Sequence, residues 1–268
     1  MKEIIIKDVT EENIEEFCWF CVAPNKRNDP DWQKGVEYKR QWAEAMLKKW
    51  GPFAKLAYHN NCPVGMIQYQ PIPEQRIVYI DCIWVPLENY WQKGIATKLL
   101  NKLLEDIKNF AITGLKNKSV LALVTKTFPG GAPNQLTAQQ FFTKKGFQPI
   151  GKDPNYLYYP LKPGFVYRPK RKKAIKYKPQ KEDKGKVLIV CGPNPCSATY
   201  PYFLKRMEKY IREIDAKIPI EWLDTAQDSE AVKKRKVNIG DCIVNAKLIK
   251  AFVLDKAGFQ NEVKKALQ

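Results

Sequence analysis

The stretch "CIWVPLENYWQKGIATKLLNKLL", residues 82–104, decides how the first part of the chain folds. It starts with an apolar, β-branched run that stops at Pro86, which is typical of the end of a strand. A short polar turn follows, and from Gly94 onward apolar residues recur at the spacing of an amphipathic helix. The stretch therefore predicts a strand, a tight turn and a helix in direct succession.

The start of that helix is a candidate anion site. The first turn of a helix has free backbone N–H groups, and the helix dipole favours negative charge there. Gly94 lets a ligand approach the backbone, Ala96 is small for the same reason, Lys93 adds positive charge and Thr97 adds a hydroxyl. The pattern suits a pyrophosphate, and the alternative is a loop that only turns the chain.

Length and composition bound the other possibilities. With 268 residues, 44% of them hydrophobic and 28% charged, the chain is expected to form one large or two smaller folded domains. No apolar run is long enough to span a membrane, and the N-terminal stretch lacks a signal-peptide hydrophobic region, so we expect a cytoplasmic protein. The net charge of +18 favours polyanionic partners, namely nucleic acid, an acidic substrate or a phosphorylated cofactor. The alternative is a solvated basic surface with no such partner.

Hydrophobic periodicity predicts an alternation of strands and helices in residues 1–160. The first helix is expected to be capped by Thr10, and "DPDWQKG", residues 29–35, is expected to be a turn-rich connection. The expected elements are strands at 3–9, 53–58, 64–72, 75–85, 119–125 and 156–161, and helices at 10–22, 36–50, 94–110 and 134–147.

Residues 161–185 have a different composition. Prolines and lysines dominate and no core period is present, so we expect a basic linker. The alternative is a nucleic-acid-binding arm, because Phe165, Tyr167 and Tyr177 alternate with the charges and could stack on bases.

Residues 186–268 predict a second, smaller domain. The expected order is strand, helix, strand, helix, a hairpin around Asn245 and Ala246, and a final helix. This βαβ–ββα order is the thioredoxin-like order. The fold class expected for the whole chain is thus α/β (α+β), with a mixed, mostly antiparallel sheet flanked by helices and a thioredoxin-like domain after it.

Two separated motifs resemble the Gcn5-related N-acetyltransferases, the GNAT family. "WQKGIA", Trp91–Ala96, is similar to the family's Q/R-x-x-G-x-G/A signature, and "QQFFTKKGF" ends in Gly146–Phe147 like the second signature. The resemblance covers residues 1–160 and implies binding of acetyl-CoA, with its pyrophosphate at the helix start. More narrowly, the chain resembles acetyltransferases with a YoaP-like C-terminal region.

The resemblance also implies site residues. The backbone of Ile83, Trp84 and Val85 would pair with the pantetheine arm of acetyl-CoA where this strand separates from the strand at 119–125. Two positions depart from the family's pattern, because Trp91 replaces a Gln or Arg and Phe142 replaces a Tyr that protonates the leaving thiolate. The positions expected to contact the cofactor are Ile83, Trp84, Val85, Gln92, Lys93, Gly94, Ile95, Ala96, Thr97 and Phe142.

Acetyl transfer to an amine needs a base to deprotonate the ammonium and can use an acid for the thiolate. Asp81 is the preferred base, because a carboxylate within an apolar strand has a raised pKa. Its alternative role is a hydrogen-bonded structural aspartate. Glu88 is the alternative base, and Tyr158 and Tyr159 are candidate acids. Cys82 is expected on the face of the strand opposite Asp81, as a buried hydrophobe or as an acyl-accepting thiol.

The other cysteines suggest two further possibilities. Cys191, Cys196 and Cys242 would converge on a thiol site of the second domain, although the spacing is not that of a redox motif. The alternative is a structural remnant. His59 and Cys62, together with Cys18 and Cys21, invite a zinc interpretation, but the two cysteines lie on an apolar helix and we expect no metal.

The leading hypothesis is therefore an acyltransferase that moves an acetyl group from acetyl-CoA to a small-molecule or peptide amine by direct attack. One alternative is a non-catalytic nucleic-acid-binding or adaptor protein, with nucleic acid the less favoured partner. Another is a two-site protein with a thiol-redox second domain. The expected boundaries are 1–160, 161–185 and 186–268, and the sequence leaves the acceptor and the oligomeric state open.

Overall fold

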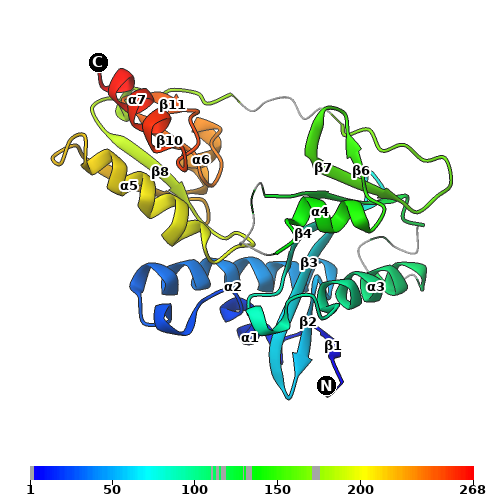
Figure 1. The fold of residues 1–268 in the computed structure, drawn as a ribbon. Coiled ribbons are helices and arrows are strands. Elements are labelled where there is room, and N and C mark those ends of the chain that lie inside the picture. The colour runs from blue at the N-terminus through cyan, green and yellow to red at the C-terminus, as the bar shows by residue number, and fades with distance from the viewer. Residues whose placement is uncertain are drawn as a thin grey trace. The chain divides into compact units, whose positions relative to one another are not determined.

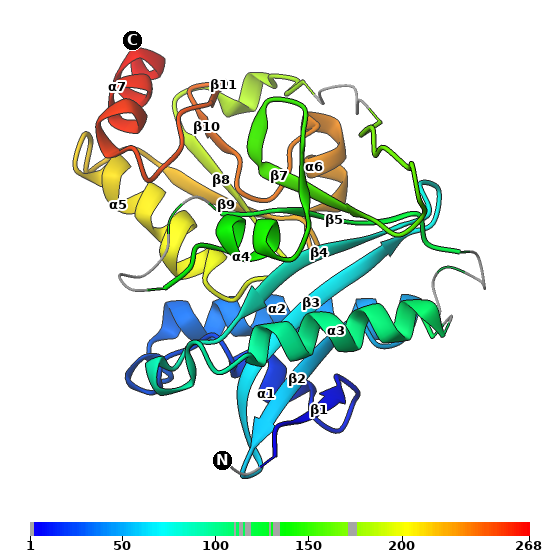
Figure 2. The same ribbon diagram turned by 45° about the vertical axis from the view of Figure 1, so that its right-hand side comes forward.

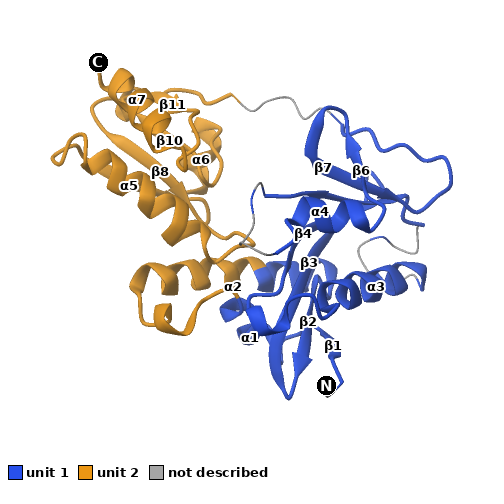
Figure 3. Cartoon of the chain, in the orientation of Figure 1, with its two compact units in different colours: residues 1–20, 43–171 blue, residues 21–42, 172–268 orange. Residues whose placement is uncertain are grey.

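The chain forms two compact units in a computed structural model, which describes residues 3–109, 111–112, 115, 119–128, 130, 135–170 and 176–268. Unit 1 comprises Met1–Phe20 and Ala43–Arg171, and unit 2 comprises Cys21–Trp42 and Lys172–Gln268 (Figure 3). The division falls inside helix α2, Pro30–Trp50. The C-terminal unit thus includes a segment from near the N-terminus, a grouping that the sequence did not suggest.

Unit 1 is built on one sheet with helices packed against it (Figure 1). Its strands are β1 Ile5–Asp8, β2 Ala54–His59, β3 Cys62–Ile72, β4 Ile77–Trp84, β5 Ala122–Lys126, β6 Gln148–Ile150 and β7 Asp153–Pro160. Its helices are α1 Ile14–Trp19, the second half of α2, η2 Glu88–Tyr90, α3 Ile95–Lys108 and α4 Ala138–Lys144.

The 7-stranded sheet has the order β1-β2-β3-β4-β5-β7-β6 (Figure 2). Every neighbouring pair is antiparallel except β4 and β5, which are parallel and joined through α3. The expected fold class, a mixed and mostly antiparallel sheet flanked by helices, is confirmed. The turn expected between β2 and β3 is also confirmed, with Asn60 and Asn61 at φ 51 and 61°, as a tight hairpin requires.

Three expectations about local structure were wrong. Helix α2 begins at Pro30, inside the segment expected to be a turn, because proline is favoured in the first turn of a helix. The N-terminal cap position of α1 is Asn13 and not Thr10, whose own N–H donates to Asn13 Oδ1 at 2.8 Å. The 3-residue strand β6 was not expected at all. The expected helix ends at Phe110 and Asn134 lie outside the described residues.

The two faces of the sheet carry separate apolar clusters. Helices α3 and α4 cover one face, where Leu99, Leu103 and Phe142 pack against Ile67 and Ile80. The opposite face carries a smaller cluster that includes Tyr158 of β7 and reaches Phe165 and Tyr167 beyond it. The amphipathic pattern of α3 is thus explained by one-sided burial.

A buried charge cluster ties α3 to the sheet. Lys55 of β2 has only 1% of its side chain exposed, and its ammonium contacts the carboxylates of Asp8 and Asp106. Asp106 lies near the C-terminal end of α3 and also pairs with Lys102 at 3.4 Å. A buried lysine is tolerated only where its charge is paired, so these contacts fix that end of α3 against β2.

Unit 2 contains a 4-stranded sheet of order β11-β10-β8-β9. Strands β8 and β9 are parallel, whereas β10 is antiparallel to β8 and to β11. The expected βαβ–ββα order and the hairpin at Asn245 and Ala246 (φ 47 and 59°) are confirmed. The elements are β8 Val187–Cys191, η5 Thr199–Leu204, α5 Lys205–Arg212, β9 Ile220–Asp224, α6 Ser229–Arg235, β10 Cys242–Val244, β11 Lys247–Ile249 and α7 Lys256–Leu267.

The basic segment after residue 160 packs at both ends. In unit 1, Tyr167 is buried and its hydroxyl donates to Gln75 Oε1 at 2.8 Å. In unit 2, the Tyr177 hydroxyl donates to Asp183 Oδ2 at 2.6 Å. Phe165, Tyr167 and Tyr177, which could stack on bases in the alternative of a nucleic-acid-binding arm, therefore pack against the protein itself.

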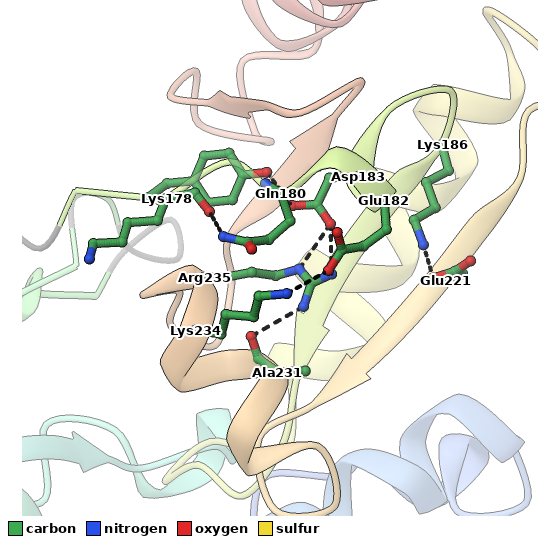
Figure 4. A network of polar contacts seen from close by, with 10 residues as sticks. Lys178, Gln180, Glu182, Asp183, Lys186, Glu221, Ala231, Lys234 and Arg235 are labelled. Carbon is green, nitrogen blue, oxygen red and sulfur yellow. Dashed lines mark hydrogen bonds and ion pairs between the residues drawn. The ribbon is translucent and has the colours of Figure 1, made fainter.

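A polar network holds the second end of this segment (Figure 4). Asp183 has no exposed side-chain surface, and Arg235 of α6 donates to its Oδ1 at 2.7 and 2.9 Å. Burial raises the pKa of Asp183, but the bonds from Arg235, Tyr177 and the Gln180 amide outweigh it and hold the pKa below its ordinary value. Figure 4 also shows Lys234 reaching Glu182, at 3.0 Å.

Among the residues described, no helix has the length and apolarity to cross a membrane.

We expect Lys55→Met to lower the free energy of unfolding by about 3–5 kcal/mol, because it leaves the Asp106 carboxylate without its buried partner. The double variant Lys55→Met/Asp106→Leu should recover most of that loss, since an apolar pair replaces the charges. Lys102→Met, at an exposed lysine of the same cluster, is the control and should change stability by less than about 1 kcal/mol. Urea unfolding followed by circular dichroism measures all three, and equal losses for Lys55→Met and Lys102→Met would contradict the assignment.

Candidate functional site

Strands β4 and β5 separate before either one ends. Their parallel pairing runs from Ile77 with Ala122 to Ile80 with Thr125. Strand β4 continues to Trp84, and there it pairs only with β3 on its other side among the described residues. Ile83 and Trp84, the two positions expected to pair with the pantetheine arm, therefore lie beyond the last pair of β4 with β5.

A β-bulge lies where the strands separate. The β3–β4 register passes from Tyr69 opposite Ile80 to Gln68 opposite Cys82, so Asp81 is the extra residue. Cys82 faces the same side as Gln68, and the Gln68 amide also acts on the Asp81 carboxyl. The expectation that Cys82 and Asp81 lie on opposite faces was therefore wrong, because the bulge breaks the two-residue alternation.

Asp81 is a buried carboxyl with few partners. Gln70 Nε2 donates to its Oδ1 at 2.9 Å, while Oδ2 is buried without a hydrogen-bond partner among the described residues. Burial raises the pKa of Asp81 to about 7, although the Gln70 and Gln68 amides lower it in part. A carboxyl with this pKa can accept a proton near neutral pH, which suits a general base.

The N-terminus of α3 has backbone donors without a capping side chain. Gly94 is the cap residue at φ 75°, and no side chain caps the helix. The first helical bond is Lys98 N–H to the Gly94 carbonyl at 2.9 Å, so the N–H groups of residues 95–97 precede it. A Cβ built on Gly94 would meet no atom within 4 Å, so the cap position itself is open. Uncapped N–H groups at a helix start suit an anion.

Trp91 has a structural role that explains its departure from the family's signature. Its indole Nε1 donates to the Val85 carbonyl at 2.9 Å, and its ring packs against the core cluster of α3. This bond closes the loop between the end of β4 and the start of α3. The bond also uses one lone pair of the Val85 carbonyl, which leaves the other for a ligand. Gln92 and Lys93, the next two residues after Trp91, are exposed.

Gly65 is a site residue that the sequence analysis missed. A Cβ at Gly65 would lie 2.6 Å from Cγ2 of Ile95 and 3.2 Å from Cδ1 of Leu99. Strand β3 therefore lets the first turn of α3 approach closely only because position 65 has no side chain. A single glycine within an apolar strand was the available signal for such an approach.

Tyr90 was also missed. Its hydroxyl lies 2.8 Å from His59 Nδ1, and the Lys93 ammonium lies 5.7 Å from the centre of its ring. This contact links the β2–β3 turn to the loop before α3. It also involves His59, one of the residues considered for zinc.

Across the described part of the chain, no group of three or more His, Cys, Asp or Glu could hold a metal ion.

The remaining candidate residues are placed as follows. Phe142 is 2% exposed, and its ring centre lies 4.8 Å from that of Phe147, so it packs in the core. Glu88 is exposed in η2. Tyr158 is buried and its hydroxyl donates to Gln148 Oε1 at 3.2 Å, while the Tyr159 ring packs on Phe147. Neither Glu88 nor Tyr158 hydrogen-bonds Asp81.

The three cysteines expected at a thiol site have different surroundings. Cys191 and Cys242 are buried in the same apolar cluster of unit 2, and burial raises the pKa of both thiols. Cys196 is exposed in the loop after β8.

Comparison with known structures gives several similar proteins. An acetyltransferase of the GNAT family from Staphylococcus aureus Mu50 is 20% identical with a TM-score of 0.41, covering 60% of this chain and 100% of its own. The PaiA N-acetyltransferase from Thermoplasma acidophilum, solved with coenzyme A, is 13% identical with a TM-score of 0.40, covering 58% and 96%. A GNAT family acetyltransferase from Brucella melitensis, solved with acetyl-CoA, is 15% identical with a TM-score of 0.41, covering 62% and 93%.

No curated protein matches the sequence. The sequence pattern of the Acetyltransferase (GNAT) family, in contrast, matches residues 11–147, which is just over half of the chain. That range contains the bulged strand β4, the uncapped start of α3 and the helix that ends before Gly146–Phe147. The chain therefore belongs to the GNAT acetyltransferase family.

Proposed function

We propose that unit 1 is an N-acetyltransferase that transfers the acetyl group of acetyl-CoA to an amine by direct attack. The observation that carries the proposal is the separation of β4 from β5 at Ile80, beside a carboxyl with a pKa of about 7. Membership of the GNAT family supports it.

The start of α3 would bind the pyrophosphate of acetyl-CoA. The N–H groups of Ile95, Ala96 and Thr97 lack a capping side chain, and the helix dipole favours negative charge at this end. The Lys93 ammonium adds charge at the same loop. Because Trp91 is engaged with Val85, binding of the phosphates rests on the backbone from Gln92 to Thr97.

The free edge of β4 would hold the thioester arm. Ile83 and Trp84 lie beyond the last pair of β4 with β5, so an amide-bearing chain could add there in place of a strand. The Val85 carbonyl already accepts from Trp91, which leaves its other lone pair and the Val85 N–H for a ligand. Donors fixed in the fold need no rearrangement to stabilise charge on the thioester oxygen.

Asp81 would act as the general base. An amine acceptor arrives as an ammonium ion and must lose a proton before it can attack the thioester carbon. The proton would pass to the free Asp81 Oδ2, while Gln70 holds Oδ1. Phe142 has no proton to give, so the leaving thiolate would take its proton from solvent or from a tyrosine, for which Tyr158 and Tyr159 are the candidates. Glu88 is the alternative base.

The acceptor would be a small-molecule or peptide amine. The residues that select it would lie in the first two helices and in the loop at residues 126–134, of which residues 129 and 131–134 lie outside the described range. For unit 2 we propose a thioredoxin-like fold, supported by its element order and its strand order of β11-β10-β8-β9.

Acetyl-CoA should raise the melting temperature of the protein, because a ligand that binds only the native state stabilises it. At a free concentration one hundred times its dissociation constant, the gain is about 2.7 kcal/mol. Thermal unfolding in the presence of acetyl-CoA measures this gain, and pantetheine, which lacks the phosphates, is the control. No shift at millimolar acetyl-CoA would refute the proposed function.

Gly65→Ala should weaken acetyl-CoA binding roughly tenfold or more, because its Cβ would displace Ile95 and with it the first turn of α3. Ile95→Leu removes the Cγ2 methyl that the new Cβ would meet, so Gly65→Ala/Ile95→Leu should recover part of the affinity. Calorimetric titration of the three variants tests this. If Gly65→Ala binds acetyl-CoA as tightly as the native protein, the position of the first turn of α3 does not depend on residue 65.

The unfolding free energy should depend on pH through Asp81. Its folded pKa of about 7 is above the ordinary value of 3.8, so the native state retains a proton that the unfolded chain releases. Stability from this group is present below about pH 4 and is lost as pH rises to about 7. Asp81→Asn should remove this decline, and a rising limb of acetyl transfer near pH 7 should disappear with it. An identical slope of stability with pH in Asp81→Asn, measured by urea unfolding, would contradict the assignment.

A further inference from the structure

Unit 2 contains a thiol pair that the sequence does not suggest. Cys21 belongs to this unit although it lies more than a hundred residues before the first strand of the unit's sheet, β8. Cys21 is half-buried and Cys196 is exposed, whereas Cys191 and Cys242 are buried. Cys196 is thus the exposed thiol of the unit, and Cys21 is the one other cysteine of the unit that is not fully buried.

Helix α2 brings these two cysteines to one place. A Cβ on Gly35 would lie 2.0 Å from the backbone oxygen of Ser197, so the residue next to Cys196 sits directly against the helix. Lys39, one turn further along the same face, has its ammonium 4.0 Å from Cys21 Sγ. The Cys196 loop therefore lies against the helix at Gly35, and Cys21 lies at the tip of the Lys39 side chain, which starts one turn further along. A thiolate at Cys196 would raise the pKa of Cys21 further, because like charges disfavour each other.

The surroundings suit thiol chemistry. Burial raises the pKa of Cys21, and the Lys39 ammonium counteracts part of that rise, because a cation stabilises the thiolate. Lys39 is fully buried, so its charge is not screened by bulk water. Cys196 is held by its N–H bond to Asn194 Oδ1 at 3.0 Å. Next to it, the hydroxyl of Ser197 is fully buried without a hydrogen-bond partner among the described residues.

Cys191 is not available as the partner of Cys196. Its sulfur lies 3.2 Å from the Tyr38 hydroxyl, which donates its single proton to Asp224 Oδ2 at 2.7 Å. Burial raises the pKa of this thiol too. Cys191, the cysteine nearest to Cys196 in sequence, is therefore fixed in the core. Cys21 is the remaining candidate that is not fully buried.

We infer that Cys196 and Cys21 form a dithiol that reduces low-molecular-weight disulfides, with Cys196 as the attacking thiol and Cys21 as the resolving thiol. The Cys196 thiolate attacks one sulfur of the disulfide, its S–S bond breaks, and one small thiol leaves. The Cys21 thiolate then attacks Cys196 Sγ in the mixed disulfide and releases the second small thiol. Two protein thiols lose their protons and become one disulfide, and the two released thiolates take up those protons.

The test uses the full chain and oxidised glutathione as the probe disulfide. After exposure and alkylation of remaining thiols, mass spectrometry of peptides should find a Cys21–Cys196 disulfide in the native protein. Cys21→Ser should accumulate glutathione on Cys196, and this mixed disulfide should persist roughly tenfold longer or more, since no resolving thiol follows. Cys196→Ser should show neither product.

Cys62 provides the matched control, because it is an exposed cysteine of unit 1 and takes no part in the proposed Cys21–Cys196 pair. Glutathione on Cys62 should persist equally in the native protein and in Cys21→Ser. Because the disulfide is mapped in the native chain, the result does not depend on how well a variant folds. A Cys191–Cys196 disulfide, or equal persistence of glutathione on Cys196 with and without Cys21, would overturn the inference.

Discussion

The separation of β4 from β5 after Ile80 is the constraint on which the rest of unit 1 depends. Paired parallel strands satisfy each other's backbone groups, whereas a strand that continues alone leaves donors and acceptors that need another partner. The bulge at Asp81 occurs at this point and turns an acidic side chain to the face of Gln68 and Gln70. A backbone edge for a ligand and a buried carboxyl therefore result from one irregularity of the sheet.

The anion site proposed at the start of helix α3 depends on both ends of the helix being fixed. At its start, the missing side chain of Gly65 lets Ile95 lie against β3. Near its end, Lys55 binds Asp106 in a buried charge cluster. Trp91 completes the arrangement by bonding the Val85 carbonyl, which closes the loop that joins β4 to the helix. Each contact serves packing, and together they place the helix dipole beside the free strand edge.

The sequence predicted what depends on local patterns, and it failed where contacts between distant residues decide. The alternating and helical periods located β2, β3, β4 and α3, and two short motifs indicated the family. The bulge was not predictable, because nothing in "IVYIDCIW" shows which residue β3 leaves unpaired, and so Cys82 was placed on the wrong face. The role of Trp91 was also hidden, since its bond partner is a backbone carbonyl. Burial of Tyr167 and Tyr177 depended likewise on distant partners.

The cysteines of unit 2 show why spacing along the chain is a poor guide to thiol chemistry. Cys191 and Cys196 are near each other in sequence, yet one is the last residue of a buried strand and the other lies in an exposed loop. A thiol that is fully buried in the core cannot be reached by a disulfide, whatever its neighbours in sequence are. What matters is which accessible thiol the fold brings to Cys196. Gly35 allows the Cys196 loop to lie against α2, and the same helix face carries Lys39 beside Cys21. The inferred thiol pair is therefore a consequence of how α2 packs within unit 2.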